Sequence, residues 1–75
     1  MVHYFEPLIH GNYIYKEISN QNGNVTSVFT CCNSCAIWSE DQYVLDNWDN
    51  IRDDCKLISE QAAINFLTKA KFNNC

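Results

Sequence analysis

The chain has 75 residues and a net charge of −4, a length that fits one domain. Hydrophobic residues make up 47% and charged residues 19%, values ordinary for a globular protein, so a wholly disordered chain is excluded. The five basic residues are scattered, and no Lys/Arg cluster is available to displace counterions from a phosphate backbone or an anionic lipid surface. We therefore expect neither direct nucleic-acid binding nor membrane binding.

The N-terminus has no basic segment followed by a long apolar run, so it does not resemble a signal peptide. No stretch approaches the roughly 18 consecutive apolar residues of a membrane-spanning helix. We therefore expect a cytoplasmic protein with reduced thiols. With only Gly11 and Gly23, the chain has no glycine-rich phosphate loop, and we expect no cofactor.

A β-hairpin is the clearest element of the first half. Segments 13–19 and 25–32 are rich in aromatic and β-branched residues, which favours two strands. Asn22-Gly23 between them suits a type I′ turn, in which both central residues need a positive φ. Residues 2–5 are a candidate edge strand, and 36–38 a candidate extension of the sheet. The hairpin register stays open, because the length of the loop decides which side chains share a face. A two-residue loop would place on one face Ile14, Lys16, Phe29 and Cys31.

The second half predicts two helices, over 40–54 and 60–71. Ser39 and Gln42 have the spacing of a capping box, with Ser39 as the N-cap of the first helix. Ser59 is the expected N-cap of the second, and 56–58 is a short extended link between them. Each helix has an apolar stripe at helical spacing. The first stripe contains Val44, Trp48, Ile51 and Cys55, and the second contains Ala63, Ile64, Leu67 and Ala70. The fold class is therefore α+β: one domain with a small antiparallel sheet built on the hairpin, followed by two helices.

The sequence Cys-Cys-Asn-Ser-Cys at 31–35 contains a C-x-x-C pair, the spacing with which two thiolates bind one Zn²⁺. A second closely spaced ligand pair is missing, so we expect no metal site. The alternative is a small zinc-binding module that uses Cys32, Cys35 and Cys55. A redox role is not favoured, because the motif follows a strand and does not open a helix. No nucleophile–base arrangement is recognisable in the sequence, and we do not expect an enzyme.

The most unusual segment is the helix predicted over 40–54, which contains six carboxylates and only one cation, Arg52. Positions 46, 49 and 53 would form a line of aspartates on a regular helix, opposite the apolar stripe. Like charges at this spacing destabilise a helix slightly, so stability alone does not favour the pattern. One interpretation is a solvated face that confers solubility, and the other is a contact surface for a basic partner. The candidate partner-binding residues are Glu40, Asp41, Tyr43, Asp46, Asp49 and Asp53.

The sequence therefore favours a non-enzymatic protein-interaction domain. A small acidic inhibitor or regulator of the phage or mobile-element type fits the size, the charge and the composition, in which Asn is abundant and Gly and Pro are scarce. Its expected partner is a basic or nucleic-acid-binding host protein, since carboxylates can occupy phosphate positions in a basic groove. An exposed strand edge would also allow the chain to form a homodimer.

Overall fold

The computed structural model describes residues 1–9, 11–34 and 36–74, with side chains through Ala70. Five strands form one antiparallel sheet in the order β4-β3-β2-β1-β5. The strands are β1 (Val2–Pro7), β2 (Tyr13–Ser19), β3 (Val25–Cys32), β4 (Ser39–Glu40) and β5 (Cys55–Ile58). The helices of this described part are α1 (Gln42–Asp46), α2 (Trp48–Asp53) and α3 (Glu60–Asn74). The α+β class and the hairpin strands are confirmed.

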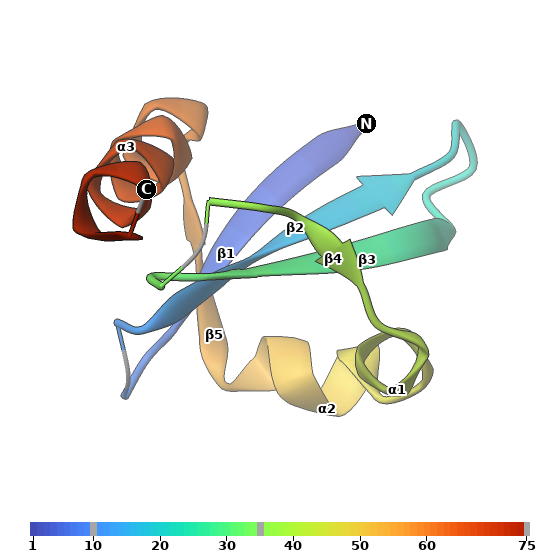
Figure 1. Cartoon of the computed structure of the whole chain (residues 1–75). Coiled ribbons are helices and arrows are strands. Elements are labelled where there is room, and N and C mark those ends of the chain that lie inside the picture. The colour runs from blue at the N-terminus through green and yellow to red at the C-terminus, as the bar shows by residue number, and fades with distance from the viewer. Residues whose placement is uncertain (10, 35, 75) are drawn as a thin grey trace.

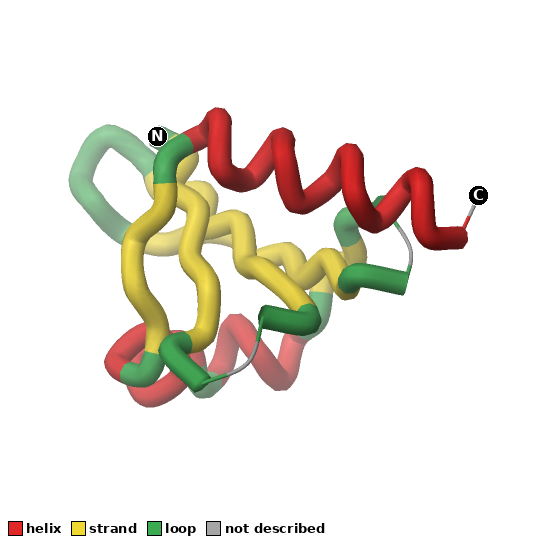
Figure 2. The backbone as a smooth tube through the Cα atoms, turned by 90° about the vertical axis from the view of Figure 1, so that its left-hand side faces the viewer, coloured by secondary structure: helices red, strands yellow, loops and turns green. Residues whose placement is uncertain are grey.

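The helices cover opposite faces of the sheet. Figure 1 shows the chain leaving β4, passing through α1 and α2 along the bottom of the view, and returning as β5. Figure 2 shows α3 above the sheet and the two short helices below it. No helix in the described residues is both long enough and apolar enough to span a membrane. The molecule is thus a three-layer arrangement with a separate apolar core on each side of the sheet.

Alternate residues of β2 supply the two cores, because side chains in a strand point to opposite faces in turn. Ile14 is buried against Cys31 and Ala63 on the α3 side. Its neighbour Tyr15 is buried on the other side, where it packs with Val28, Val44 and Trp48 beneath α1 and α2. Burial of one such apolar side chain contributes about 1.5–3 kcal/mol. Apolar packing therefore stabilises the sheet on both of its faces.

The predicted type I′ turn at Asn22-Gly23 is wrong. Only Gly23 has a positive φ, +84°, and no other described residue does. The loop spans 20–24, and the Asn20 side chain accepts hydrogen bonds from the backbone N–H groups of Asn22 and Asn24. A β-bulge beside the turn then shifts the register by one residue. This shift restores the pairing that a two-residue loop would give, with Ile14 opposite Cys31 and Lys16 opposite Phe29.

Replacing Gly23 with alanine is expected to destabilise the fold by about 1–2 kcal/mol, the cost of a left-handed backbone for a residue with a Cβ. Nothing lies within 4 Å of the position that a Cβ would take, so the cost is conformational and not steric. Gly11→Ala is the matched control: the space is equally open there, and φ is not positive. Thermal unfolding of both variants checks this. Equal melting temperatures for the two would contradict the expectation.

The predicted helix over 40–54 is divided into α1 and α2 at Asn47. Asn47 has φ −111° and ψ 17°, and its side-chain amide donates to the Tyr43 carbonyl at 2.8 Å. Through this bond the short polar side chain of Asn47 competes with the regular hydrogen bonds of a helix. The capping box is also wrong. Ser39 lies in β4, and Asp41 is the N-cap, accepting from the N–H groups of Tyr43 and Val44.

The second predicted helix corresponds to α3, which extends to Asn74. Ser59 caps it as expected, since its hydroxyl accepts from the Ala62 N–H at 3.1 Å. Ala63 and Ala70 are buried, but Ile64 is 44% exposed and does not belong to the buried stripe. The extension predicted for 36–38 is also displaced: these residues are not in a strand, and β4 follows them.

Lys16 links residues 36–38 to the sheet through cation–π contacts. Its ammonium lies 4.8 Å from the centroid of the Phe29 ring and 4.7 Å from that of Trp38. Trp38 in turn packs against Tyr4, with ring centroids 6.1 Å apart. A cation between two aromatic faces is stabilised by both ring quadrupoles. Sequence patterning did not reveal this contact, since the partners come from three separate segments.

Lys16→Met is expected to lower the free energy of unfolding by about 1–2 kcal/mol, because methionine keeps the apolar stem and loses the charge. Lys56→Met is the control, since Lys56 forms an exposed ion pair with Glu6 at 2.8 Å, and such pairs contribute about 0–1 kcal/mol. Urea unfolding of the two variants measures the difference. If Lys56→Met costs as much as Lys16→Met, the two rings do not stabilise the ammonium.

Candidate interaction surface

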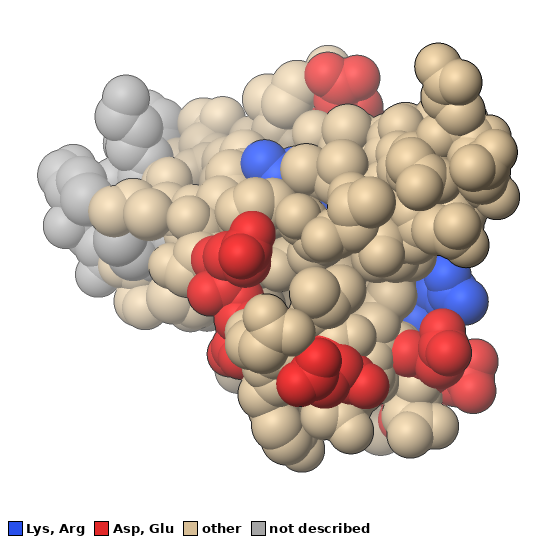
Figure 3. All heavy atoms as spheres, turned by 90° about the vertical axis from the view of Figure 1, so that its right-hand side faces the viewer, with Lys and Arg blue, Asp and Glu red and all other residues tan. Residues whose placement is uncertain are grey.

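Six carboxylates lie within fifteen residues, from the end of β4 to the end of α2, and all of them are exposed: Glu40, Asp41, Asp46, Asp49, Asp53 and Asp54. Figure 3 shows acidic side chains gathered over the lower half of one face, where Figure 1 places α1. Glu40 lies in β4, Asp41 is the N-cap of α1, and Asp46 is the last residue of α1. Asp49 and Asp53 lie in α2, and Asp54 is its C-cap. The break at Asn47 spreads them over two short helices. They therefore form a patch and not the single line that a regular helix would give.

The only cation of this segment is turned toward the sheet. The Arg52 guanidinium donates to a Glu17 carboxylate oxygen at 3.1 Å, while its second nitrogen lies 3.6 Å from Asp49. The Glu17 side chain is only 7% exposed, whereas that of Asp49 is 95% exposed. An ion pair with the buried partner is screened less by solvent, so Glu17 takes the larger share of the Arg52 charge. The exposed carboxylates are left largely unneutralised.

Glu17 also fixes the position of α2. Trp48, the first residue of that helix, donates its indole N–H to the same Glu17 oxygen at 2.7 Å. His3 lies on the other side, with Nδ1 3.4 Å from the second carboxylate oxygen. A buried carboxylate is costly unless it is paired and hydrogen-bonded, and this one has three partners. The polar cluster thus ties β1 and β2 to the helix that bears the aspartates.

The three aspartates that sequence patterning places in one line have different surroundings. Asp46 accepts a hydrogen bond from the Gln42 amide at 2.9 Å. Asp49 is the weak second partner of Arg52. Asp53 is exposed, and within the described residues its carboxylate has neither an ion pair nor a hydrogen bond. All three remain open to solvent and available to a cationic partner.

Tyr43 stands among these carboxylates with 72% of its surface exposed. It lies on α1 next to buried Val44, whose packing in the core holds the short helix in place. An exposed aromatic ring on a fixed backbone is the residue type most often found at the energetic centre of protein interfaces. The patch therefore combines charge with one large apolar anchor. We call the set Glu40, Asp41, Tyr43, Asp46, Asp49 and Asp53 the acidic surface.

The structure does not bring Cys32 and Cys55 together. Cys32 is in β3 opposite Tyr13, and Cys55 is in β5 opposite Pro7. Two strands separate them, so their backbones are about 14 Å apart at the usual strand spacing, too far to share one ion. Within the described residues, no group of three potential ligands is close enough to hold a metal. The separation of Cys32 and Cys55 argues against the alternative zinc site with all three cysteines, and Cys35 lies outside the described residues.

A small depression of about 210 Å³ lies beside α2, lined by Tyr13, Tyr15, Cys55 and three further residues. Burial raises the pKa of the Tyr15 hydroxyl above its usual range, and the adjacent Tyr13 adds to the effect. Burial also raises the pKa of the Cys55 thiol, with a smaller contribution from the Asp54 charge. Both groups are therefore held neutral, as expected for packing positions and not for an activated nucleophile.

These raised pKa values predict a loss of stability in alkali. A group whose pKa is higher in the folded state favours folding below its unfolded pKa, and that contribution is lost as the pH rises above it. The ordinary values are 9.0 for the thiol and 10.0 for the phenol, so the free energy of unfolding should fall from pH 9 upward. Tyr15→Phe should flatten this decline relative to Tyr43→Phe, which removes an exposed hydroxyl. Identical pH slopes for the two variants would show that burial of Tyr15 is not the cause.

Comparison of the chain with family models, with curated proteins and with solved structures gives no match. The function is therefore inferred from the geometry of the chain. Sequence patterning found the acidic surface and missed Glu17. The alternation in 13–19 did signal that Glu17 shares a face with Tyr15, but nothing in it indicated that Trp48 and Arg52 would cover that face.

Proposed function

We propose that this protein is a non-enzymatic interaction domain that acts as a small acidic inhibitor or regulator of the phage or mobile-element type. Its partner is a basic, nucleic-acid-binding host protein in the cytoplasm, and its contact region is the acidic surface. The observation that carries the proposal is the orientation of Arg52. Because this cation is paired with buried Glu17, the carboxylates around Tyr43 keep their negative potential.

The energetics of the segment support a role in binding. Aspartates crowded on short helices repel one another, and aspartate is a poorer helix former than glutamate. Buried Trp48 and Val44 offset this cost and hold the charged face in a fixed position. A preorganised charged face speeds encounter with an oppositely charged partner and sets its register. Tyr43 then supplies apolar contact area at a low cost in side-chain entropy.

The experiment is affinity capture from host lysate, followed by competition. The immobilised chain should retain a basic protein, and short duplex DNA should displace that protein, because the carboxylates and the phosphates would occupy the same groove. Displacement should weaken in parallel with DNA binding as salt is raised. Capture of an acidic protein, or of a basic protein that binds DNA and this chain simultaneously, would contradict the proposal.

A further inference from the structure

The sheet has an open notch at the start of β1. β5 pairs with β1 only from Cys55 to Ile58, and Ile58 lies opposite Tyr4. The chain then turns into α3 at Glu60, so β5 does not continue along the first residues of β1. On its other side, β1 is paired with β2 as far as Val2 opposite Ile18. The first part of β1 is therefore paired on the β2 side and unpaired on the side where β5 ends.

The register determines which backbone groups face this notch. In an antiparallel pair, successive residues direct their N–H and C=O groups to alternate sides. The Leu8 N–H donates to the Asp54 carbonyl at 2.9 Å, which places even-numbered residues of β1 on the β5 side. The Ser19 N–H donates to the Met1 carbonyl at 2.9 Å, which places odd-numbered residues on the β2 side. The N–H and C=O groups of Val2 consequently point into the notch.

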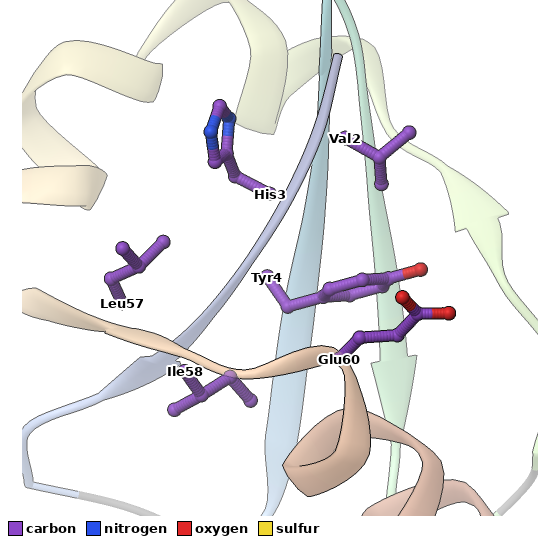
Figure 4. Close-up of a pocket in the computed structure, with 6 residues that line it drawn as sticks. All are labelled: Val2, His3, Tyr4, Leu57, Ile58 and Glu60. Carbon is purple, nitrogen blue, oxygen red and sulfur yellow. The ribbon is translucent and has the colours of Figure 1, made fainter.

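The notch is also a pocket of about 360 Å³, within the size range of small binding sites. Figure 4 shows its lining, which comes from β1, β5 and the first turn of α3: Val2, His3, Tyr4, Leu57, Ile58 and Glu60. Val2 is 49% and Leu57 63% exposed, so apolar side chains flank this unpaired part of the strand. Such an edge accepts an extended segment through main-chain hydrogen bonds.

The charge of the pocket defines the chemistry of that segment. Figure 4 shows the Glu60 carboxylate beside the hydroxyl end of the Tyr4 ring, both on the same side of β1. No cation pairs with Glu60 among the described residues, because the cations of the adjoining strands have other partners. Lys16, opposite Tyr4, lies over the Phe29 and Trp38 rings, and the Met1 ammonium donates to the Ser19 carbonyl. Lys56 pairs with Glu6. His3 lies on the opposite side of the strand, toward Glu17. A carboxylate next to an aromatic ring attracts a Lys or Arg side chain through charge and through the ring quadrupole.

We propose that this notch binds an extended, basic segment of another protein by strand addition. The backbone of the segment pairs with Val2 on the side of β1 where β5 has ended. The segment places a Lys or Arg side chain between Glu60 and Tyr4. This site is separate from the acidic surface, because it is formed by the start of β1, the end of β5 and the start of α3. It does not depend on the proposed function.

The test is an NMR titration of the full chain with a blocked five-residue peptide, threonine–valine–lysine–valine–threonine, and with the same peptide carrying glutamate in place of lysine. The lysine peptide should give saturable amide shifts at Val2, Leu57 and Glu60 at about millimolar concentration. Glu60→Gln should weaken binding about fivefold, as expected for an exposed ion pair. Val2→Pro should abolish binding, because proline removes the N–H that faces the notch, whereas Val2→Thr keeps that N–H and should bind normally.

Circular dichroism of each variant establishes that it is folded, and proline is tolerated on an edge strand. Equal binding of the two peptides would overturn the assignment of a basic segment. Unchanged binding by folded Val2→Pro would overturn strand addition, and the absence of saturable shifts would overturn the site itself. Shifts at Val2 that depend on protein concentration without peptide would show that a second copy of the chain occupies the notch, which also overturns the proposal. The synthetic peptides give these results whatever is captured from lysate.

Discussion

Trp48→Ala is expected to abolish the cooperative unfolding transition. The indole is buried between Phe5 and Tyr15, with ring centroids 5.5 and 5.3 Å away, and it donates to Glu17. Truncation of a buried tryptophan costs about 3–5 kcal/mol, and loss of a donor to a buried carboxylate adds about 1–3 kcal/mol. A domain of this size has a total stability of about 3–5 kcal/mol. Near-UV circular dichroism should therefore show no fixed aromatic packing.

Trp48→Phe separates the two contributions. Phenylalanine keeps an aromatic ring in the core and lacks the N–H donor, so this variant should fold and lose about 1–3 kcal/mol. Tyr43→Ala is the control for loss of an aromatic residue at an exposed position, with an expected change within about 0.5 kcal/mol. A Trp48→Ala protein that melts within a few degrees of the wild type would show that the core beneath α1 and α2 is not essential.

The second large effect is expected on partner binding. Replacing Asp46, Asp49 and Asp53 together with asparagine removes three exposed negative charges and leaves the size of each side chain almost unchanged. The affinity for the captured partner should fall about tenfold or more, mainly through a slower association rate, because rim charges act on encounter. Surface plasmon resonance at two salt concentrations measures both the rate and its ionic-strength dependence.

The matched control adds the same net charge elsewhere. Gln21, Asn65 and Thr68 are exposed, on the hairpin loop and on α3, and their replacement with lysine also changes the total charge by three units. If the acidic surface is the contact region, this control should bind within about threefold of the wild type, since distant exposed charges are screened at physiological salt. An equal loss for the two variants would mean that net charge alone governs the interaction.

Local sequence patterns predicted an element well where one pattern alone was enough to identify it. The aromatic and β-branched runs gave β2 and β3, and Ser59 gave the start of α3. Patterns that depended on one polar side chain were less reliable. Asn47 satisfies a carbonyl of the preceding turn and divides a helix, and Asn20 organises a loop in place of a two-residue turn. Both choices depend on hydrogen bonds that compete closely with regular structure.

The candidate site shows a similar division. The exposed carboxylates and Tyr43 were predictable, because polar residues opposite an apolar stripe face solvent. The role of Glu17 was not, because a charged residue in a strand normally indicates a solvent-facing position. Its partner Arg52 is 35 residues away in sequence, and no periodicity connects the two. The notch beside Val2 likewise depends on where β5 ends, which only the three-dimensional pairing determines.

A footprint of the bound partner on the labelled chain tests the role of the acidic surface most directly. Amide shifts or protection from hydrogen exchange, measured with the purified captured protein, should cluster on Tyr43, Asp46, Asp49 and their neighbours in α1, α2 and β4. The exposed face of α3 and the hairpin loop should remain unchanged. A footprint confined to α3 or to the notch at Val2, with α1 and α2 unaffected, would show that the acidic surface is solvated and that binding occurs elsewhere.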